Sequence, residues 1–535
     1  MNFLNLSLIT PNLILGKPKK NAEVIISEIK NSKADIVAFP ELSLTGSTCG
    51  DLFFQNSFIK EAQNALEEIV KNCEKLAIVG TPYLEKNKLY NAAVIIHNKK
   101  IIATCKKKNS NSRWFEKGEK EIPKIIINGK TLAITIGEDI FLNDSPCTDI
   151  VININAMSED ISDIIATNSK RLSCCYAICN AGFYESTTDY VFNNPNEIYE
   201  NGEFLGKISS VGFFNATKSY EEAVEISITQ NSEFIRKIPQ SPFTKNLDLG
   251  KTNKLLENAS IAIKRRLSHI GSKKAVIGIS GGLDSTMALL TLRNAIAPKN
   301  IIAISMPGFG TSEKTKTNAK KLIELIGAEY REIDITKSVQ IHLDDIGHKG
   351  EIDITFENAQ ARERTQILMD VANLEGGIVI GTGDLSEAAL GFCTYGGDHI
   401  SMYNPNAGLP KTAIRYLVNH IAETEPQLTE ILTNILNTKI SPELIKNQDT
   451  EKIVGPYLIN DFFLYYLLKY NLGKEDIAFL AKHTFPEHDT YKLIEDFYNR
   501  FYKSQYKRSN ATDGPMLLGV SLSPRGGFVL PSDIY

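Results

Sequence analysis

Hydrophobic residues follow two different patterns along the chain, and the pattern changes near residue 250. Up to about residue 235, short aliphatic runs alternate with longer amphipathic segments. Short runs rich in β-branched residues predict strands, whereas apolar residues spaced three and four apart predict helices. The expected strands are 76–80, 92–96, 125–127 and 132–136, and the expected helices are 21–30 and 58–73.

From about residue 252, apolar strands alternate with helices in a regular order. A helix is expected at 255–267, and strands are expected at 275–279, 301–306 and 378–380. This alternation predicts a parallel, doubly wound α/β sheet, which binds its ligands at the carboxyl ends of the strands. A Pro-Gln-Ser-Pro segment at 239–242 indicates a linker, because proline interrupts helices and strands. We therefore expect one domain at 1–238 and a second at 252–535.

Composition and charge exclude several classes of protein. The chain has 535 residues, a net charge of −4 and 42% hydrophobic residues, which is typical of a globular protein without a nucleic-acid surface. No apolar stretch is long enough to span a bilayer, and the first nine residues alternate like a strand rather than a signal peptide. The eight cysteines include no CxxC pair. A reducing cytoplasm is therefore expected, with no membrane partner.

Three of the cysteines, Cys174, Cys175 and Cys179, lie close together in the sequence. We expect them on a helix, as buried thiols without a chemical role.

The segment after the strand at 275–279 carries the strongest chemical signal. Residues 280–285 read Ser-Gly-Gly-Leu-Asp-Ser, and a helical pattern follows directly. Glycines let backbone N–H groups approach an anion, and a helix N-terminus favours phosphate. Asp284 beside a bound triphosphate predicts a Mg²⁺ ligand, because the metal offsets the like-charge repulsion. Ser280 and Ser285 can donate hydrogen bonds to phosphate oxygens.

Two further segments supply polar residues in a similar setting. Residues 381–387 read Gly-Thr-Gly-Asp-Leu-Ser-Glu and follow another buried strand, so Thr382 is placed to contact a nucleotide and Glu387 to share the metal or bind substrate. Asn358, Arg362 and Thr365 have the spacing of one helix face. A solvated polar face is the alternative interpretation of that pattern.

These segments occur together with Ala-Gly-Leu-Pro-Lys-Thr at 407–412 and Lys-Arg-Ser at 507–509, and the set resembles the glutamine-dependent NAD synthetases. The resemblance implies an N-type ATP pyrophosphatase domain that adenylates deamido-NAD with Mg²⁺-ATP and releases pyrophosphate; ammonia then displaces AMP to give NAD. It implies ATP contacts at Gly278, Ser280, Gly281, Gly282, Asp284, Ser285, Thr382 and Lys411, deamido-NAD contacts at Asn358, Arg362, Glu387 and Lys507, and metal ligands at Asp284 and Glu387.

The first half resembles the nitrilase superfamily through Phe-Pro-Glu at 39–41, Asn-Ala-Ala at 91–93 and Arg-Trp-Phe-Glu at 113–116. The resemblance implies a four-layer αββα sandwich with a Glu, Lys and Cys catalytic set that would release ammonia from glutamine through a thioester. Glu41 would be the general base. Lys106 fits the lysine best, and Lys107 is the next candidate.

The nucleophile of that set is missing. Residues 134–140 read Ile-Thr-Ile-Gly-Glu-Asp-Ile, so Gly137 occupies the position of the family's cysteine. The family's Leu-Pro-Asn-Tyr segment is also absent, and Met-Ser stands at 157–158 where Ser-Pro is expected. We therefore expect an amidase domain that has lost its activity, with ammonia supplied from solution or by a partner amidase.

Two alternatives remain open from the sequence. The protein could be fully glutamine-dependent, with a nucleophile supplied by Cys49 or Cys147, or it could be a non-catalytic nucleotide-binding protein. The resemblance also implies a homo-oligomer.

Overall fold

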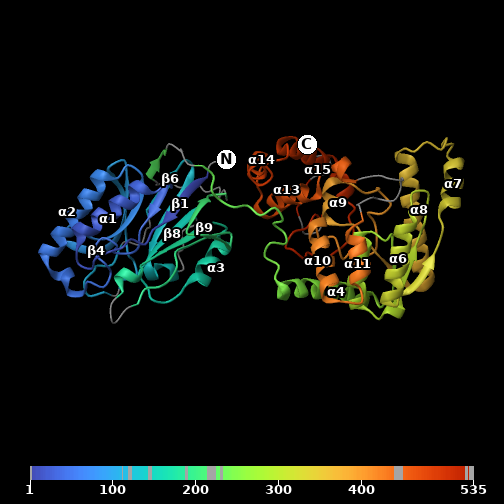
Figure 1. The fold of residues 1–535 in the computed structure, drawn as a ribbon, viewed down its shortest axis with the longest axis horizontal. Helices are drawn as coiled ribbons and strands as arrows, with labels where there is room; N and C mark the ends of the chain where they lie inside the picture. Colours follow the sequence, from blue (N-terminus) through green and yellow to red (C-terminus); the bar gives the residue numbers. More distant parts are fainter. Residues whose placement is uncertain are drawn as a thin grey trace. The chain divides into compact units, whose positions relative to one another are not determined.

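The computed structural model describes residues 3–110, 112–118, 123–142, 148–186, 191–213, 224–228, 233–438, 450–524, 528 and 530. The chain divides into two compact units, Met1–Lys237 and Ile238–Tyr535 (Figure 1). The division falls beside Pro239, in the segment where prolines predict a linker.

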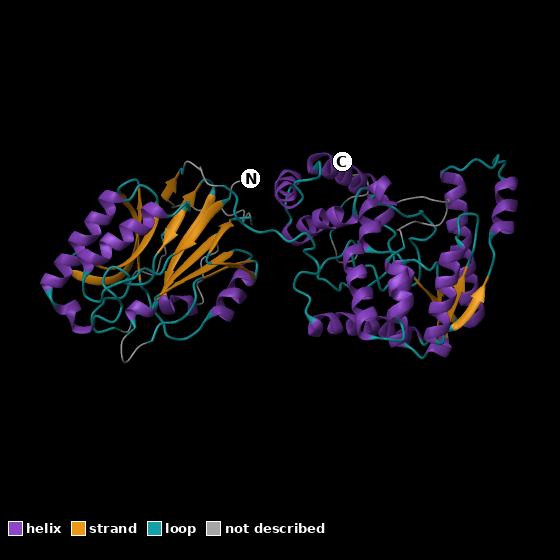
Figure 2. Ribbon diagram, viewed as in Figure 1, coloured by secondary structure: helices purple, strands orange, loops and turns teal. Residues whose placement is uncertain are grey.

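The first unit is built on two sheets, which Figure 2 shows in orange between the helices. In the described part of the chain, one sheet has six strands in the order β12-β1-β2-β3-β4-β5, and the other has seven in the order β11-β10-β9-β8-β7-β6-β13. The elements of this unit are β1 (Leu4–Leu8), α1 (Pro18–Asn31), β2 (Ile36–Ala38), α2 (Asn56–Asn72), β3 (Leu76–Glu85), β4 (Lys88–His97), β5 (Lys100–Lys106), β6 (Lys124–Ile127), β7 (Lys130–Ile136), β8 (Ile150–Asn155), α3 (Ser162–Leu172), β9 (Cys175–Asn180), β10 (Glu197–Glu200), β11 (Glu203–Gly206), β12 (Ile208–Val211) and β13 (Val224–Ile226).

The two sheets and the helices on their outer faces form four layers, because alternate side chains of the strands point to opposite faces of each sheet. Helices α1 and α2 cover the outer face of the six-stranded sheet, where Ile25 packs with Val37. The inner faces of both sheets meet in a shared core that contains Leu6 and Ile134. Helix α3 covers the outer face of the seven-stranded sheet through Ile165. The αββα sandwich expected from the sequence is therefore confirmed.

Strand β9 corrects one expectation. Cys175 and Cys179 lie on this strand rather than on a helix, and Cys174 directly precedes it. Cys175 and Cys179 face the core between the sheets, while Tyr176 and Ile178 face α3. Because both faces of the strand are buried, its sequence lacks the apolar and polar alternation that would have identified it.

The second unit contains a parallel sheet in the order β16-β15-β14-β17. Ile277 of β14 packs in the core formed with α4, α5, α6, α10 and α11, whereas the adjacent Val276 packs in the core formed with α7 and α8. The doubly wound fold is confirmed. The elements of this unit are α4 (Leu249–Ile270), β14 (Lys274–Gly278), α5 (Leu283–Ala295), β15 (Ile301–Ser305), α6 (Glu313–Ile326), β16 (Glu329–Glu332), α7 (Thr336–Asp345), α8 (Ile354–Glu375), β17 (Gly377–Ile380), α9 (Leu385–Leu390), α10 (Lys411–Thr424), α11 (Thr429–Leu436), α12 (Thr450–Val454), α13 (Tyr457–Tyr470), α14 (Lys474–Thr484), α15 (Thr490–Lys503) and α16 (Gln505–Arg508).

Neighbouring strands β14 and β17 run in the same direction, so their carboxyl ends lie at one edge of the sheet. The loop before α5 and the loop before α9 therefore start side by side. Among the described residues, none of the helices combines the length and the hydropathy needed to cross a bilayer.

Strand β14 should be a major source of stability, because Ile277 is 0% exposed. We expect Ile277→Ala to lower the free energy of unfolding by about 2–5 kcal/mol, through lost transfer energy and the cavity that remains. Urea denaturation of the full chain, followed by circular dichroism, measures the change. The matched variant Ile270→Ala removes the same atoms from a side chain that is 47% exposed and should change stability by less than about 1 kcal/mol. Equal effects of the two variants would contradict the assigned core.

Candidate active site

The loop between β14 and α5 has a backbone that only glycine permits. Gly281 has φ +86°, and a Cβ at this position would lie 2.2 Å from the carbonyl oxygen of Thr315. The hydroxyl of Ser280 accepts a hydrogen bond from the amide of Gly282 at 3.1 Å, which closes the turn. The loop therefore brings backbone close to the N-terminus of a 13-residue helix, where an anion is favoured.

Three carboxylates meet beside this loop. Asp284 in the first turn of α5, Asp384 before α9 and Glu387 in α9 each offer an oxygen, and these oxygens lie within 4.8 Å of one another. The Lys411 ammonium lies among them, with Nζ 2.7 Å from Asp284, 2.6 Å from Asp384 and 2.9 Å from Glu387. The cluster thus joins the ends of two strands and the start of α10.

The charges in this cluster are strongly coupled. Burial disfavours the ammonium of Lys411, which is 2% exposed, but the three carboxylates outweigh burial and raise its pKa. Burial raises the pKa of Glu387 to about 7, and it raises the pKa of Asp384 well above its usual range. With all groups ionised, three carboxylates and one ammonium leave a charge of −2, which a divalent cation would balance.

The donor set fits such a cation. Hard cations prefer carboxylate oxygens, and Oδ1 of Asp284 is buried without a hydrogen-bond partner among the described residues. Asp284, Asp384 and Glu387 would hold the ion.

A pocket of about 550 Å³ opens over the loop and the cluster. The residues expected at the nucleotide line it, apart from Gly281 and Lys411. The lining residues from that set are Gly278, Ser280, Gly282, Asp284, Ser285 and Thr382.

Three of the four residues expected at deamido-NAD contact a neighbouring segment, 391–395. The amide oxygen of Asn358 accepts a hydrogen bond from Thr394, and the guanidinium of Arg362 donates to the Tyr395 carbonyl at 3.3 Å. The Lys507 ammonium donates to the carbonyls of residues 391 and 393 at 2.8 and 2.6 Å. Of that set, only Glu387 also lines the pocket; the other three side chains support the segment beside it.

Sequence reasoning missed two residues of this site. Asp384 lies inside a segment that the sequence singled out, but its role as the third carboxylate depends on the position of Lys411. The buried amide of Asn406 donates to the carbonyls of Asp284 and Thr382, at 3.0 and 3.1 Å, and so ties the two loops together. Its signal was its place just before the 407–412 segment.

A second cluster of charged residues lies in the first unit. Glu41 accepts hydrogen bonds from Asn91 at 2.6 Å and from the Lys107 ammonium at 2.7 Å, and Lys107 also pairs with Glu138. Burial disfavours the charge on Lys107, but Glu41 and Glu138 outweigh it and raise its pKa. Gly137, with φ +49°, lies against this pair: a Cβ built on it would lie 2.7 Å from Glu41 Oε2 and 2.7 Å from Lys107 Nζ. A cysteine side chain at 137 would therefore begin between the glutamate and the lysine.

The structure places Lys107 in this pocket, where the sequence favoured Lys106. Lys106 pairs with Glu85 at 2.8 Å and lies over the Tyr90 ring. Adjacent residues at the end of β5 point to opposite sides, so a shift of one position exchanges the two lysines. The preference for Lys106 was wrong in this respect.

The structure also bears on the two cysteines considered as substitutes. Burial raises the pKa of Cys49 to about 11, and its thiol donates to the carbonyl oxygen of Thr45. Only a small fraction of Cys49 would be thiolate at neutral pH, and the thiolate is the nucleophilic form. Cys147 lies outside the described residues.

Near the same pocket, Glu185 is 2% exposed. Its Oε2 accepts hydrogen bonds from the amide and hydroxyl of Ser47 at 3.0 and 3.3 Å. Burial raises the pKa of Glu185 to about 7, and the charge of Glu41 adds to this shift.

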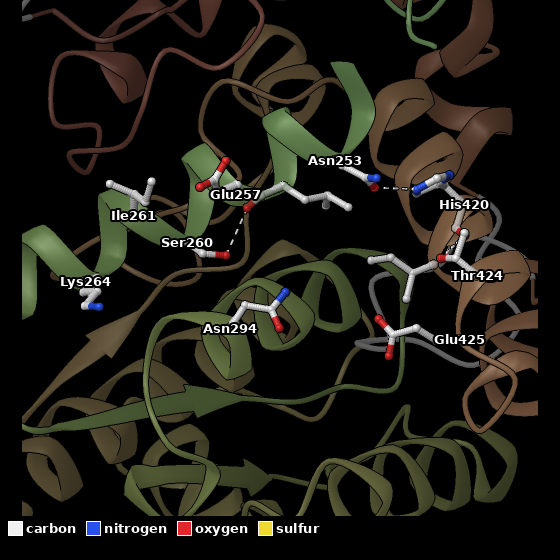
Figure 3. A pocket seen from close by; sticks show the side chains of 11 residues that line it. Asn253, Glu257, Ser260, Ile261, Lys264, Asn294, His420, Thr424 and Glu425 are labelled. Atoms are coloured by element: carbon white, nitrogen blue, oxygen red, sulfur yellow. Dashed lines mark hydrogen bonds between the residues drawn. The ribbon is translucent and has the colours of Figure 1, made fainter. Parts of the chain in front are cut away.

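A separate hollow of about 410 Å³ lies between α4, α5 and α10 (Figure 3). Its lining residues include Glu257 and Glu425, and His420 contacts the Asn253 amide oxygen at 3.0 Å across it. It contains none of the residues of the acidic cluster.

The folds and sites together define a class: a nitrilase-like unit joined to a doubly wound α/β unit with a glycine turn at a helix N-terminus and a carboxylate cluster. A family model described as NAD synthase matches residues 255–511, and one described as carbon-nitrogen hydrolase matches residues 19–188. A protein from Mycobacterium bovis named glutamine-dependent NAD(+) synthetase is 31% identical to this chain, over 99% of this chain and 96% of that protein. The chain belongs to this family of two-domain NAD synthetases.

More distant relatives cover one unit or both. A glutamine-dependent NAD(+) synthetase from Aquifex aeolicus is 27% identical over 96% of each chain. An NH(3)-dependent NAD(+) synthetase from Chlorobium phaeobacteroides is 29% identical over 48% of this chain and 86% of its own. A solved glutamine-dependent NAD(+) synthetase from Cytophaga hutchinsonii covers 99% of this chain and 98% of its own, at 17% identity and a TM-score of 0.45.

The raised pKa of Glu185 predicts a specific pH dependence. An unfolded glutamate titrates near 4.3, so between this pH and about 7 the folded chain binds more protons than the unfolded chain, and stability falls as the pH rises. Glu185→Gln should remove this decline and stabilise the first unit by roughly 3 kcal/mol above pH 7. Thermal unfolding from pH 5 to 8 measures the difference from wild type. Glu74→Gln, at a side chain that is 75% exposed, is the control; parallel pH curves for Glu185→Gln and wild type would refute the assignment.

Proposed function

We propose that this chain makes NAD by amidating deamido-NAD with Mg²⁺-ATP, and that its nitrogen comes from free ammonia because its amidase unit lacks a nucleophile. The proposal is supported by the family membership, by the pocket that gathers the phosphate loop and the carboxylates, and by Gly137.

The reaction has two steps at the second unit. An oxygen of the nicotinate carboxylate attacks the α-phosphorus of ATP, the bond to the bridging oxygen breaks, and pyrophosphate leaves. Ammonia then attacks the acyl carbon of the adenylate; AMP leaves with the bonding electron pair, and the nitrogen loses a proton. A free carboxylate is a poor acyl donor, and adenylation supplies the leaving group.

The residues of the site divide this work. Backbone and hydroxyl groups of 278–285, with Thr382, would hold the triphosphate, and Asp284, Asp384 and Glu387 would hold Mg²⁺. When bound, the metal would offset negative charge on the phosphates. Lys411 is the cation already present in the cluster, and it would stabilise negative charge on the phosphates as pyrophosphate forms. Asn358, Arg362 and Lys507 would shape the deamido-NAD site through the 391–395 segment.

The single observation that carries the choice of ammonia is the position of Gly137. A thioester requires a sulfur within reach of a base and an oxyanion-stabilising cation. Glu41 and Lys107 provide the base and the cation, and the atom between them would be the Cβ that glycine lacks. Lys107 instead pairs with two carboxylates.

The alternative is a glutamine-dependent enzyme like the relatives named so. It would require a nucleophile other than residue 137, and burial of Cys49 works against that thiol. A homo-oligomer and a cytoplasmic location remain predictions from the sequence.

The choice between donors is tested with the purified full chain, deamido-NAD and Mg²⁺-ATP. We expect NAD to form with ammonium chloride, and at least about 100-fold more slowly with glutamine, because the covalent step is lost. A coupled assay of NAD measures the synthetase reaction, and a separate assay of glutamate measures glutamine hydrolysis. Equal rates with the two donors would overturn the ammonia proposal, and no NAD from either would overturn the proposed synthetase activity.

Gly137→Cys, with Gly137→Ala as its matched control, tests whether the missing thiol at residue 137 is the reason that glutamine is not used. The cysteine would lie beside the Lys107 ammonium, which favours thiolate, so we expect residue 137 to be alkylated by iodoacetamide faster than Cys49 when peptides are analysed by mass spectrometry. The alanine adds the same Cβ without sulfur and should leave the glutamate assay at the wild-type level. Slow alkylation at 137 would show that the pocket does not activate a thiol.

Asp284 provides a test of the metal site. Asp284→Asn removes one charge from the cluster, and loss of several kcal/mol of electrostatic stabilisation should lower turnover with ammonium at least roughly 100-fold. Calorimetry with Mn²⁺ and ADP should show weaker joint binding. The control Glu257→Gln lies in the separate hollow of Figure 3, where the side chain is 58% exposed, and should leave both quantities unchanged. Unaltered turnover in Asp284→Asn would remove Asp284 from the metal site.

A further inference from the structure

Helix α10 begins without a cap from its own chain segment. Its N-cap position is Pro410, which makes no side-chain hydrogen bond to the helix. The first amides of a helix have no partner within the helix and need one elsewhere. Lys411, the lysine of the acidic cluster, is the first residue of this helix.

The missing cap comes from another helix. Asp461 of α13 is 1% exposed, and its Oδ2 accepts hydrogen bonds from the amide of Thr412 at 2.8 Å and from the Thr412 hydroxyl at 2.7 Å. Thr412 directly follows Lys411. A carboxylate at a helix N-terminus is favoured by the helix dipole as well as by these bonds.

The other oxygen of Asp461 reaches a second helix. Oδ1 accepts from the hydroxyl of Ser386, and the same hydroxyl accepts from the amide of Lys411 at 2.8 Å. Ser386 directly precedes Glu387 in α9. One carboxylate therefore fixes the residue next to Lys411 and the residue next to Glu387, so that α9 and α10 are held at a constant separation.

We propose that Asp461 is a positioning residue for the synthetase reaction: it caps α10 from α13 and fixes the Lys411 ammonium among its carboxylates. This inference rests on the proposed function, because the reaction is what the position of Lys411 serves. Asp461 acts through Lys411 and contacts Ser386 and Thr412 rather than the carboxylate cluster.

The position of Lys411 needs such support for a physical reason. A lysine side chain has four rotatable bonds, and its ammonium must satisfy three acceptors at 2.6–2.9 Å at once. Misplacement of a reacting or charge-stabilising group by about 1 Å can cost about 100-fold in rate. When the backbone of Lys411 is held in place, only the torsions of its side chain remain free.

Asp461→Ala provides the test, with Asn460→Ala as its matched control. Asn460 is the adjacent residue on α13, is 4% exposed, and donates to the carbonyls of Val454 and Gly455 at 2.9 and 3.3 Å. Both variants remove a buried polar side chain from one turn of the same helix, but only one of them reaches Lys411.

The first readout does not depend on activity. In the free protein, Lys411 should resist acetylation by acetic anhydride, because its ammonium is buried and paired. We expect Asp461→Ala to raise the acetylation rate of residue 411, measured by mass spectrometry, at least about 10-fold, with Asn460→Ala at the wild-type level. Equal protection in wild type and Asp461→Ala would overturn the inference.

The second readout is a double-mutant cycle on turnover with ammonium. Asp461→Ala and Lys411→Met should each lower kcat at least about 10-fold, and the double variant should be no worse than Lys411→Met alone within about twofold, because one acts through the other. Additive losses would show a merely structural role. Asp461→Asn, which keeps one acceptor oxygen, should recover part of kcat.

Two provisions keep the outcomes distinct. If Asp461→Ala does not fold, Ser386→Ala takes its place in the cycle, because it removes the same link to the Lys411 amide. If wild type makes no NAD with any donor, the proposed function fails, and the acetylation rates still decide whether Asp461 holds Lys411.

Discussion

The ammonium of Lys411 among three carboxylates is the interaction on which the second unit depends. Asp284, Asp384 and Glu387 come from the ends of two parallel strands and the helices that follow them, and like charges this close would repel one another in a buried setting. One lysine at 2.6–2.9 Å from all three offsets that repulsion. The same contact holds α10 against the edge of the sheet where a nucleotide would bind.

With all its groups ionised, the cluster would have an excess of negative charge, and a bound divalent cation would balance that charge. A fully compensated cluster would serve only to connect helices. Asp284 and Glu387 of this cluster line the pocket, next to a turn whose backbone excludes any side chain at Gly281. A cation and a polyanion bound together would each offset the charge of the other and of the protein.

The first unit contains a similar cluster of charged side chains around Lys107. Lys107 lies between Glu41 and Glu138, much as Lys411 lies among its carboxylates. Gly137, which lies against Glu41 and Lys107, has no side-chain atom. Glu41 and Lys107, 2.7 Å apart, form an ion pair, which by itself provides no nucleophile for an amide.

Much of this could be predicted from the sequence because the signals are local. The loop at 280–285 belongs to a contiguous strand, glycine turn and helix, so these residues indicated their own structure, and the absence of a side chain at Gly137 could be read from one position. The doubly wound fold followed from the order of strands and helices in the second half, whereas the αββα sandwich followed from the resemblance of the first half to the nitrilase superfamily. The helix expected at Cys174–Cys179 failed because a strand buried on both faces carries no periodicity.

What the sequence could not decide are contacts between segments far apart along the chain. Lys106 and Lys107 are adjacent and chemically equivalent, and only the direction of the strand end assigns one to Glu41. Asp461 lies 49 residues from Thr412, and nothing in its neighbourhood marks it as a helix cap. Short stretches of sequence determine local propensity and the chemical type of each side chain. The partners of a buried charge depend instead on how whole helices pack, and this packing is established only when the chain has folded.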